Sequence, residues 1–264
     1  MLVDLTRDLT AADAAARLKA QGFVTLTPSA LAAQCGLTPV ALPALNGEWD
    51  RLAPDTHLKD GGRYRHRRHG CLVQDLGDDG TTRRLRDTPH RAHWQPTTYN
   101  ALHGGLTRWF EPLSGAMAQS AAWRGLVAHL GELFAQVRRP AQGRWFIEAH
   151  PFRIDTADGV GRPTPEGAHR DGVDFVAVML VGRQSIIGGE TRVFEADGTQ
   201  GVRFTLDRPW SALLIDDERV IHESTPIQRD PAAPEVPGVR DTLVLTYRQH
   251  GFQAPADEVP PVLD

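Results

Sequence analysis

The hydrophobic and polar positions alternate along much of the second half of the chain, as they do in β-strands. In residues 144–154 (RWFIEAHPFRI), Glu148 and His150 share one face with two phenylalanines, and the opposite face is apolar. Because unpaired buried charge is costly, this polar face predicts either a wet pocket or a buried Glu–His pair with a structural role. Residues 173–181 (VDFVAVMLV) are apolar on both faces, which predicts a strand that other elements cover on both sides.

Turn signals separate these segments at short intervals. Asp197-Gly198 lies between two strand-like stretches and predicts a hairpin, and the pair Gly188-Gly189 allows a tight turn or a close backbone approach. Residues 240–248 (RDTLVLTYR) predict a further strand with an arginine at each end. Short strands spaced by turns indicate an all-β sandwich or a jelly roll.

Helical spacing is confined to the part of the chain before residue 140. Thr10 can cap a helix over residues 11–21, which ends at Gly22, and residues 29–34 form a second candidate helix. Residues 114–137 carry apolar side chains at helical spacing. We therefore expect a mainly β fold, with a jelly-roll core flanked by N-terminal and central α-helices. No linker or repeat is evident, so the expected organisation is one domain over residues 1–264, with a helical and strand part to about 140 and the core at about 141–252.

Composition and charge limit the function. The 264 residues carry a net charge of −4, without the basic excess of a general nucleic-acid binder. No uncharged apolar stretch of about 18 residues occurs, and the N-terminus (MLVDLTRDLTAAD) lacks an apolar signal core. We therefore expect a cytoplasmic protein with neither a nucleic-acid nor a membrane partner. Cys35 and Cys71 form no CxxC motif, and we expect them to be free thiols.

Candidate metal ligands lie in the motifs AHRD and VIHEST. On a β-strand, His169 and Asp171 would point to the same face, and His222 lies on another β-branched stretch. Two histidines and one carboxylate form the facial triad of non-heme Fe(II) oxygenases, which leaves the opposite positions open. A structural zinc site would tend to close with four ligands, often cysteines. His150 is a competing ligand, but it has no carboxylate two residues away and ranks below His169.

Three further sequence motifs accompany these candidate ligands in a defined order. GGETRVF (residues 188–194) follows the first histidine, WSALLIDDERVIHESTPI (residues 210–227) contains the second, and RDTLVLTYR completes the set. In this order the chain resembles the Fe(II)/2-oxoglutarate-dependent dioxygenases, and among them the bacterial amino-acid hydroxylase group that includes isoleucine dioxygenase. The resemblance is strong over residues 148–252 and fainter over residues 64–110. It implies a double-stranded β-helix (cupin-like) core.

The resemblance also implies the cofactors and their ligands. The three metal-ligand candidates would hold Fe(II), with 2-oxoglutarate and O2 in the open positions and ascorbate as a further candidate cofactor. Arg240 and Thr242 resemble the Arg-x-Ser with which many members hold the 2-oxoglutarate tail. Arginine suits this task because it stays charged and binds a carboxylate bidentately. Arg248 lies roughly 26 Å further along the strand, and we expect Arg240 to be the one that reaches.

The implied reaction is hydroxylation of a small molecule, a free L-amino acid or a derivative, coupled to decarboxylation of 2-oxoglutarate to succinate and CO2. Related halogenases replace the carboxylate ligand with a small residue; Asp171 is kept here, which favours hydroxylation or desaturation. The candidate substrate-binding residues are Glu148, His150, Arg65 and Arg67. For the stretch that holds the two arginines (GGRYRHRRHG), a solvated basic edge strand is the alternative.

Other interpretations stay open at this point. A cupin-like metal dioxygenase or isomerase would not need 2-oxoglutarate, and a non-catalytic jelly-roll module would only bind a ligand. Each of these interpretations is compatible with a homodimer. His90 and His93 lie in a polar loop and are expected at the surface. Residues 94–110 either cover the cofactor mouth, as the resemblance implies, or pack aromatic side chains against the barrel.

Overall fold

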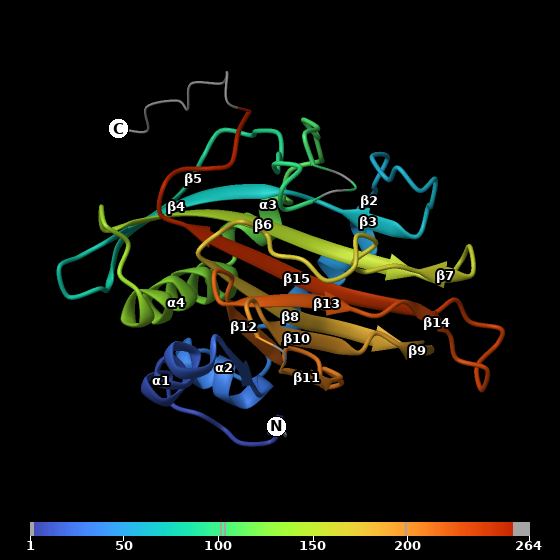
Figure 1. The fold of residues 1–264 in the computed structure, drawn as a ribbon, viewed down its shortest axis with the longest axis horizontal. Helices are drawn as coiled ribbons and strands as arrows, with labels where there is room; N and C mark the ends of the chain where they lie inside the picture. The colour runs from blue at the N-terminus through green and yellow to red at the C-terminus, as the bar shows by residue number, and fades with distance from the viewer. Residues whose placement is uncertain (1–2, 101, 103, 199, 256–264) are drawn as a thin grey trace.

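A large antiparallel sheet runs through the computed structural model, which describes residues 3–100, 102, 104–198 and 200–255 (Figure 1). Within these residues the sheet has nine strands in the order β1-β12-β8-β15-β6-β3-β2, and β4 and β5 extend it from β6. The strands are β1 (Phe23–Leu26), β2 (Ala53–Pro54), β3 (Arg65–Arg67), β4 (Gly70–Leu76), β5 (Thr82–Asp87), β6 (Arg144–Asp155), β8 (Phe175–Gln184), β12 (Ala212–Asp216) and β15 (Val239–Arg248).

Two three-stranded sheets, ordered β11-β10-β13 and β7-β14-β9, form the opposing layer. Val193 of β10 and Val220 of β13 pack into one hydrophobic cluster with Val176 of β8 and Leu213 of β12. Antiparallel layers that enclose a common interior form a jelly roll, so the predicted mainly β, double-stranded β-helix core is confirmed. The strands of this layer are β7 (Val160–Gly161), β9 (Ile186–Gly188), β10 (Thr191–Glu195), β11 (Gly201–Phe204), β13 (Val220–Ser224) and β14 (Ile227–Arg229).

Helices cover the outer face of the large sheet, and α1, α2 and α4 lie together on this side (Figure 1). Thr10 caps α1 by accepting a hydrogen bond from the amide of Asp13, as its position in the sequence predicts. The apolar stripe of α4 is fully buried, with Trp123, Leu126 and Leu130 at its centre. The helical elements are α1 (Ala11–Gln21), α2 (Pro28–Gln34), the 3-10 helix η1 (Pro43–Arg51), α3 (Gly115–Gln119) and α4 (Ala121–Val137).

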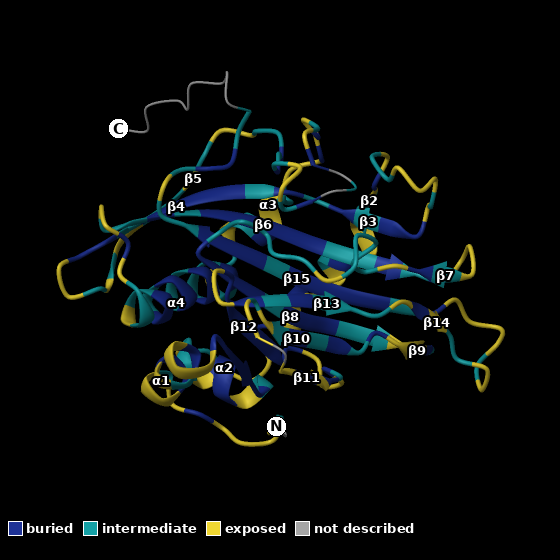
Figure 2. Ribbon diagram, viewed as in Figure 1, coloured by how far each residue is buried: buried dark blue, intermediate teal, exposed yellow. Residues whose placement is uncertain are grey.

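The central strands divide their side chains between two environments. On β15, Leu243, Leu245 and Tyr247 are fully buried in the core shared with the helices (Figure 2). The alternate positions of the same strand, from Arg240 to Arg248, line a cavity inside the jelly roll. Strand β6 behaves in the same way: its polar face lines the cavity, and Glu148 and His150 on that face are also buried 3.6 Å apart, so both predicted alternatives are present in part. Because side chains alternate along a strand, each of these two strands has one apolar face in the core and one face that lines the cavity.

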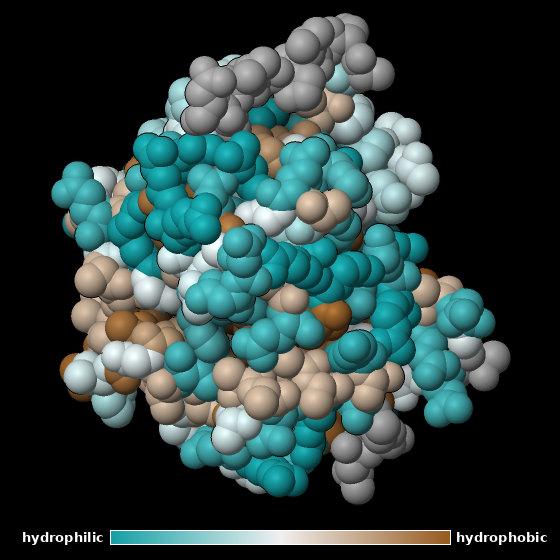
Figure 3. All heavy atoms as spheres, turned by 90° about the vertical axis from the view of Figure 1, so that its left-hand side faces the viewer, coloured by the Kyte–Doolittle hydropathy of each residue, from teal (hydrophilic) through white to brown (hydrophobic). Residues whose placement is uncertain are grey.

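The surface carries mixed polarity, as the net charge indicates. On the face drawn in Figure 3, hydrophilic residues predominate and hydrophobic ones are scattered among them. Among the described residues, none of the helices is long and apolar enough to span a lipid bilayer. Cys35 and Cys71 are free thiols, as expected.

Candidate active site

His169, Asp171 and His222 come together at one end of the interior, with their ligand atoms all within 4.8 Å of one another. The backbones of the two histidines pair: each amide donates to the other's carbonyl at 3.0 Å. His169 Nε2 lies 3.8 Å from Asp171 Oδ1, and His222 Nε2 lies 3.7 Å from Asp171 Oδ2. These separations exceed a hydrogen bond, so the three groups face a shared space that has the size and donor types of a metal site.

The motif that carries the first two residues is not on a regular strand, and this expectation was wrong. His169 forms an isolated bridge with His222, and the chain then bends before β8 begins at Phe175. The fully buried carboxylate of Asp217 holds this bend, accepting hydrogen bonds from the amides of Asp171, Gly172 and Val173 at 2.8–3.1 Å. Asp171 is therefore aimed by three backbone amides bonded to one buried acceptor rather than by strand geometry.

The ring nitrogens of His169 already have the arrangement that metal binding requires. Its Nδ1 lies 2.9 Å from the carbonyl of Gly167 and donates to it, which leaves the Nε2 lone pair directed at the shared space. His222 Nδ1 is buried without a hydrogen-bond partner among the described residues. Although burial opposes it, the Asp171 and Glu166 carboxylates raise the pKa of His169 above its ordinary value, which reflects the concentration of negative charge here.

A cavity of about 140 Å³ connects this end of the interior to the polar face of the large sheet. Its walls come from both layers of the jelly roll, from β3 and from the segment between residues 93 and 108. Apolar side chains such as Val178, Val244 and Phe146 fill the gaps between its charged groups. The residues that the sequence had singled out all line it: Arg65, Arg67, Glu148, His150, His169, Asp171, His222, Arg240 and Thr242.

Arg240 presents an incompletely bonded guanidinium to the cavity. The residue is 3% exposed, and its Nε has no hydrogen-bond partner among the described residues. Burial, together with the neighbouring charge of Arg183, lowers the pKa of Arg240 to about 10. A buried cation beside a second, half-buried one favours an anionic ligand. Arg183 was not recognised from the sequence, and Arg248 also lines the cavity, so position along the strand does not by itself exclude it.

Arg65 and Arg67 both point inward from β3, which rules out the solvated edge strand. Arg65 Nε donates to the buried carboxylate of Asp55 at 2.7 Å, so its charge is paired. The Arg67 guanidinium lies between two aromatic rings, 3.9 Å from the centroid of Phe110 and 4.4 Å from that of Phe152. Its Nε is buried without a partner among the described residues.

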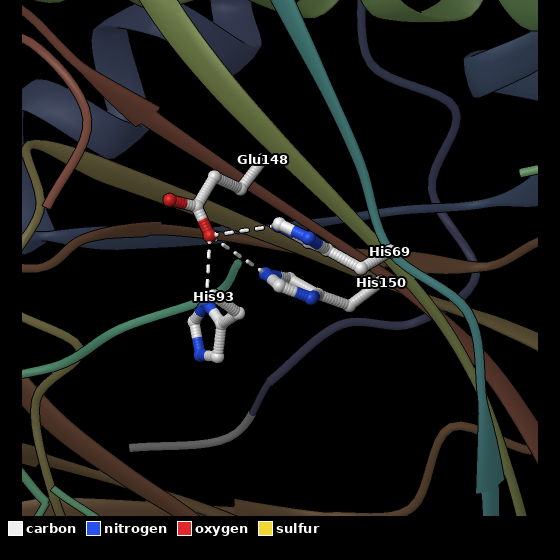
Figure 4. A group of neighbouring side chains, drawn as sticks. All are labelled: His69, His93, Glu148 and His150. Atoms are coloured by element: carbon white, nitrogen blue, oxygen red, sulfur yellow. Dashed lines mark hydrogen bonds and ion pairs between the residues drawn. The ribbon is translucent and has the colours of Figure 1, made fainter. Parts of the chain in front are cut away.

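Glu148 is the centre of a second group of buried polar side chains (Figure 4). Its Oε2 lies 2.7 Å from His93 Nδ1, 3.1 Å from His69 Nε2 and 3.6 Å from His150 Nε2. Burial opposes ionisation, but the surrounding imidazoles, His93 foremost, hold the pKa of Glu148 well below its usual range. Glu148 and His150 therefore belong to a wall of the cavity. They contact two histidines that the sequence did not indicate, of which His93 lines the cavity and His69 is buried behind it.

His93 is the clearest error of the sequence interpretation, since it is 7% exposed rather than at the surface. Its backbone pairs with that of Arg108, and the segment between them folds over the cavity. Gln95 in this segment donates to Asp171 Oδ1 at 3.3 Å and accepts from Arg108 at 3.2 Å. His90, by contrast, is exposed as expected. No periodic signal marks this segment, so its polar residues are identifiable only by where the chain places them.

Known proteins share this sequence and architecture. The family model described as 2OG-Fe dioxygenase matches residues 46–246. A bsmA homolog from Methylobium petroleophilum PM1 is 61% identical over 97% of this chain and 100% of its own, with a TM-score of 0.91. Among proteins with curated descriptions, none matches the chain.

Two more distant solved structures share the fold. IDO from Bacillus thuringiensis is 14% identical, covering 94% of this chain and 98% of its own, with a TM-score of 0.72. The Fe(II)/(alpha)ketoglutarate-dependent dioxygenase TqaL is 18% identical, covering 90% of this chain and 87% of its own, with a TM-score of 0.68. With the family model spanning most of the 264 residues, the chain belongs to the 2OG-Fe dioxygenases and is a non-heme iron enzyme that uses Fe(II), 2-oxoglutarate and O2.

Proposed function

We propose that this enzyme hydroxylates a free L-amino acid or a close derivative, with Fe(II) held by His169, Asp171 and His222. The observation that carries the proposal is the convergence of two imidazoles and one carboxylate at the end of a cavity whose other walls hold arginines. Two nitrogen ligands and one oxygen ligand leave about half of an octahedral coordination sphere for the cosubstrates. Bound iron would supply activation of O2 and of 2-oxoglutarate for the oxidation of a C–H bond.

We assign the 2-oxoglutarate tail to Arg240, with Thr242 beside it. The Nε donor of this buried guanidinium, which has no partner among the described residues, supports this assignment, because an anion that pairs with the guanidinium offsets the cost of burying its charge. Thr242 follows two residues later on the cavity-lining face of β15, and its hydroxyl can donate to the same carboxylate. Arg183, next to Arg240, adds a second positive charge at this end.

We place the substrate's anionic group at Arg67. The charge of Arg65 is paired with Asp55, which leaves Arg67 as the free cation of this wall among the described residues, and Glu148 and His150 complete it. Phe110 and Phe152 fix the plane of the Arg67 guanidinium, so its orientation needs no rearrangement when a carboxylate binds. The cavity volume of about 140 Å³ suits a small molecule, since pockets for drug-sized ligands begin at roughly 300 Å³.

Metal content and succinate release test this function together. The purified protein should bind one Fe(II) per chain, and His169→Ala and Asp171→Ala should abolish both iron binding and the release of succinate from 2-oxoglutarate. Glu148→Gln is the matched control, because it alters the second group of metal-ligand types; it should keep the iron. If His169→Ala retains iron and Glu148→Gln loses it, the metal binds at the group of histidines around Glu148 instead.

A panel of L-amino acids tests the substrate class. At least one member should stimulate succinate release with Fe(II) and O2 and appear as a product heavier by one oxygen atom. A panel without any stimulated turnover would count against the amino-acid assignment while leaving the iron site intact.

A further inference from the structure

The group around Glu148 consists of residue types that bind metals, but its hydrogen bonds indicate a different role. In a metal site the ligand atoms surround a space for the ion. Here Glu148 Oε2 itself occupies the point to which His69 Nε2 and His93 Nδ1 are directed, at hydrogen-bond distances of 3.1 and 2.7 Å (Figure 4). The centre of the group is therefore a carboxylate oxygen that accepts N–H donors.

Arg67 fixes the protonation of His150 in the same group. Arg67 Nη2 lies 2.6 Å from His150 Nδ1, and a guanidinium can only donate, so Nδ1 must accept. The proton of the neutral ring is then on Nε2, which lies 3.6 Å from Glu148 Oε2. A nitrogen that carries a proton has no lone pair for a metal, which removes His150 as a ligand without displacement of Arg67.

The same argument fixes the tautomer of His93. An ionised carboxylate only accepts hydrogen bonds, so His93 Nδ1 donates to Glu148 and carries the proton. Burial lowers the pKa of His93 to about 3, with the positive charges of Arg108 and Arg67 acting in the same direction against Glu148. The ring is therefore neutral, and its Nε2 holds a lone pair.

That lone pair is available to a ligand. The second ring nitrogen of His93 points away from Glu148 (Figure 4), and His93 lines the cavity that contains the proposed iron site. No hydrogen-bond partner for this nitrogen occurs among the described residues. Nearby, Arg67 and Arg108 each have a buried Nε without a described partner. One acceptor thus stands beside two incompletely bonded cations on the same cavity.

We propose that His93 is a specificity-determining residue whose Nε2 accepts a hydrogen bond from the substrate's ammonium group, with Glu148 as the residue that positions it. This inference rests on the proposed amino-acid hydroxylation and assigns the second half of the zwitterion. The carboxylate pairs with the guanidiniums, and the ammonium donates to a neutral imidazole backed by the Glu148 charge. A molecule with a carboxylate but no N–H or O–H donor at this place would leave Nε2 unpaired in the complex.

Two substitutions of His93 distinguish its hydrogen bond to Glu148 from the hydrogen bond that we propose to the substrate. His93→Asn keeps an N–H near the position of Nδ1, where it can still donate to Glu148, and removes the acceptor that faces the cavity. His93→Gln instead extends an amide oxygen toward the position of Nε2. We expect His93→Asn to raise the KM for the amino acid by about tenfold or more, the value of one hydrogen bond to a charged group, with little change in the KM for 2-oxoglutarate. His93→Gln should lose less.

The wild-type enzyme should turn over the deamino analogue of its amino acid with a similarly raised KM. The substitution His93→Asn should not raise the KM for that analogue any further. An unchanged KM for the amino acid in a folded, iron-loaded His93→Asn enzyme would overturn the proposal. Glu148→Gln should weaken amino-acid binding without altering that of 2-oxoglutarate, which a merely structural residue would not do selectively.

Nitrogen NMR of the imidazoles tests the tautomer without any substrate or turnover. In wild-type protein loaded with Zn(II) and 2-oxoglutarate, the His93 ring should carry its proton on Nδ1 and stay neutral from pH 8 to pH 5; the signal is assigned by its loss in His93→Asn. A proton on Nε2, or titration near the ordinary pKa of histidine, would refute the role of His93. If no L-amino acid of the panel is turned over, the proposed amino-acid function is refuted. The tautomer measured by NMR would then still show whether Nε2 of His93 is an acceptor that faces the cavity.

Discussion

At the scale of single residues, the polar side chains of this active site are aimed by other, buried side chains. Asp171 is held through the amides around it by Asp217, and His93 is held by Glu148. Arg67 is held between two aromatic rings. Buried polar atoms are costly when unpaired, so each of these supports can be tested by removing one partner.

Asp217→Ala should destabilise the protein and loosen the metal site. It leaves the three partly buried amides of the bend without their acceptor, which should lower the free energy of unfolding by about 1–3 kcal/mol. Urea denaturation and an iron-binding titration would measure the two effects. Asp207→Ala removes an exposed carboxylate from a loop and serves as the control. Equal stability of the two variants would contradict the role of Asp217.

Arg240→Ala should raise the KM for 2-oxoglutarate by about tenfold to a hundredfold, the range expected for loss of a charge-assisted hydrogen bond to a carboxylate. Steady-state succinate assays at varied 2-oxoglutarate would show the change. Arg248→Ala, at the other end of the same strand, should have a much smaller effect. If Arg248→Ala has the larger effect, the cosubstrate lies at the opposite end of the cavity.

At the scale of elements, two neighbouring strands and one glycine pair shape the cavity. β6 and β15 pair antiparallel, with Thr242 opposite Phe152 and Val244 opposite His150, so their functional faces form one continuous surface. Gly188 and Gly189 have φ values of 81° and 69°, in the left-handed region that side chains rarely adopt. A Cβ on Gly188 would lie 2.2 Å from the carbonyl oxygen of Pro226, so the close backbone approach that the sequence indicated is present.

Gly189→Ala should impair cosubstrate binding as well as stability. The added Cβ would lie 3.1 Å from Ile227 Cγ2, 3.2 Å from Arg183 Nη1 and 3.4 Å from Arg240 Cδ, so the two arginine side chains next to the proposed 2-oxoglutarate site would have to shift. Gly36→Ala is the matched control: its φ is 64°, and nothing lies within 4 Å of its Cβ. Both variants should lose about 1 kcal/mol or more of stability, but only Gly189→Ala should raise the KM for 2-oxoglutarate. An equal KM in the two variants would contradict the prediction.

At the scale of the whole molecule, the jelly roll keeps an apolar core on one side of the large sheet and a charged interior on the other. The charged interior makes stability depend on pH. His93 and His150 are buried with lowered pKa values, chiefly because of burial, and the charges of Arg67 and Glu148 act on both. Glu148 resists protonation as well. At these three groups the folded protein therefore takes up fewer protons in acid than the unfolded chain does.

The contribution of His93 to folding stability should fall as the pH drops below the ordinary histidine pKa of about 6.5. For His93, whose folded pKa is about 3, the unfolded state binds one more proton throughout the interval between the two values. Stability then changes by about 1.4 kcal/mol per pH unit, decreasing toward acid. Urea denaturation of wild-type and His93→Asn protein from pH 7.5 to pH 5 gives the free energy of unfolding at each pH. The difference between the two slopes against pH is the contribution of His93. Parallel curves would show that His93 titrates normally.

The sequence alone was sufficient for most of the fold. Alternation over β6 and β15, the Thr10 cap and the helical spacing of α4 are local patterns, and local patterns survive in the folded chain because each buries one apolar face. The family resemblance supplied the residues of the triad, and the chain brought them together although their motif does not form a strand.

Only the tertiary structure identified what surrounds those residues. His69 reaches Glu148 because β4 pairs with β6, and His93 reaches it because a non-periodic segment closes over the cavity. Arg183 meets Arg240 where β8 pairs with β15. Each of these contacts joins residues far apart in the chain, and no spacing within the sequence encodes them. The local pattern determined which face each strand buries, whereas long-range pairing decided which polar groups meet, and therefore which proton each imidazole carries.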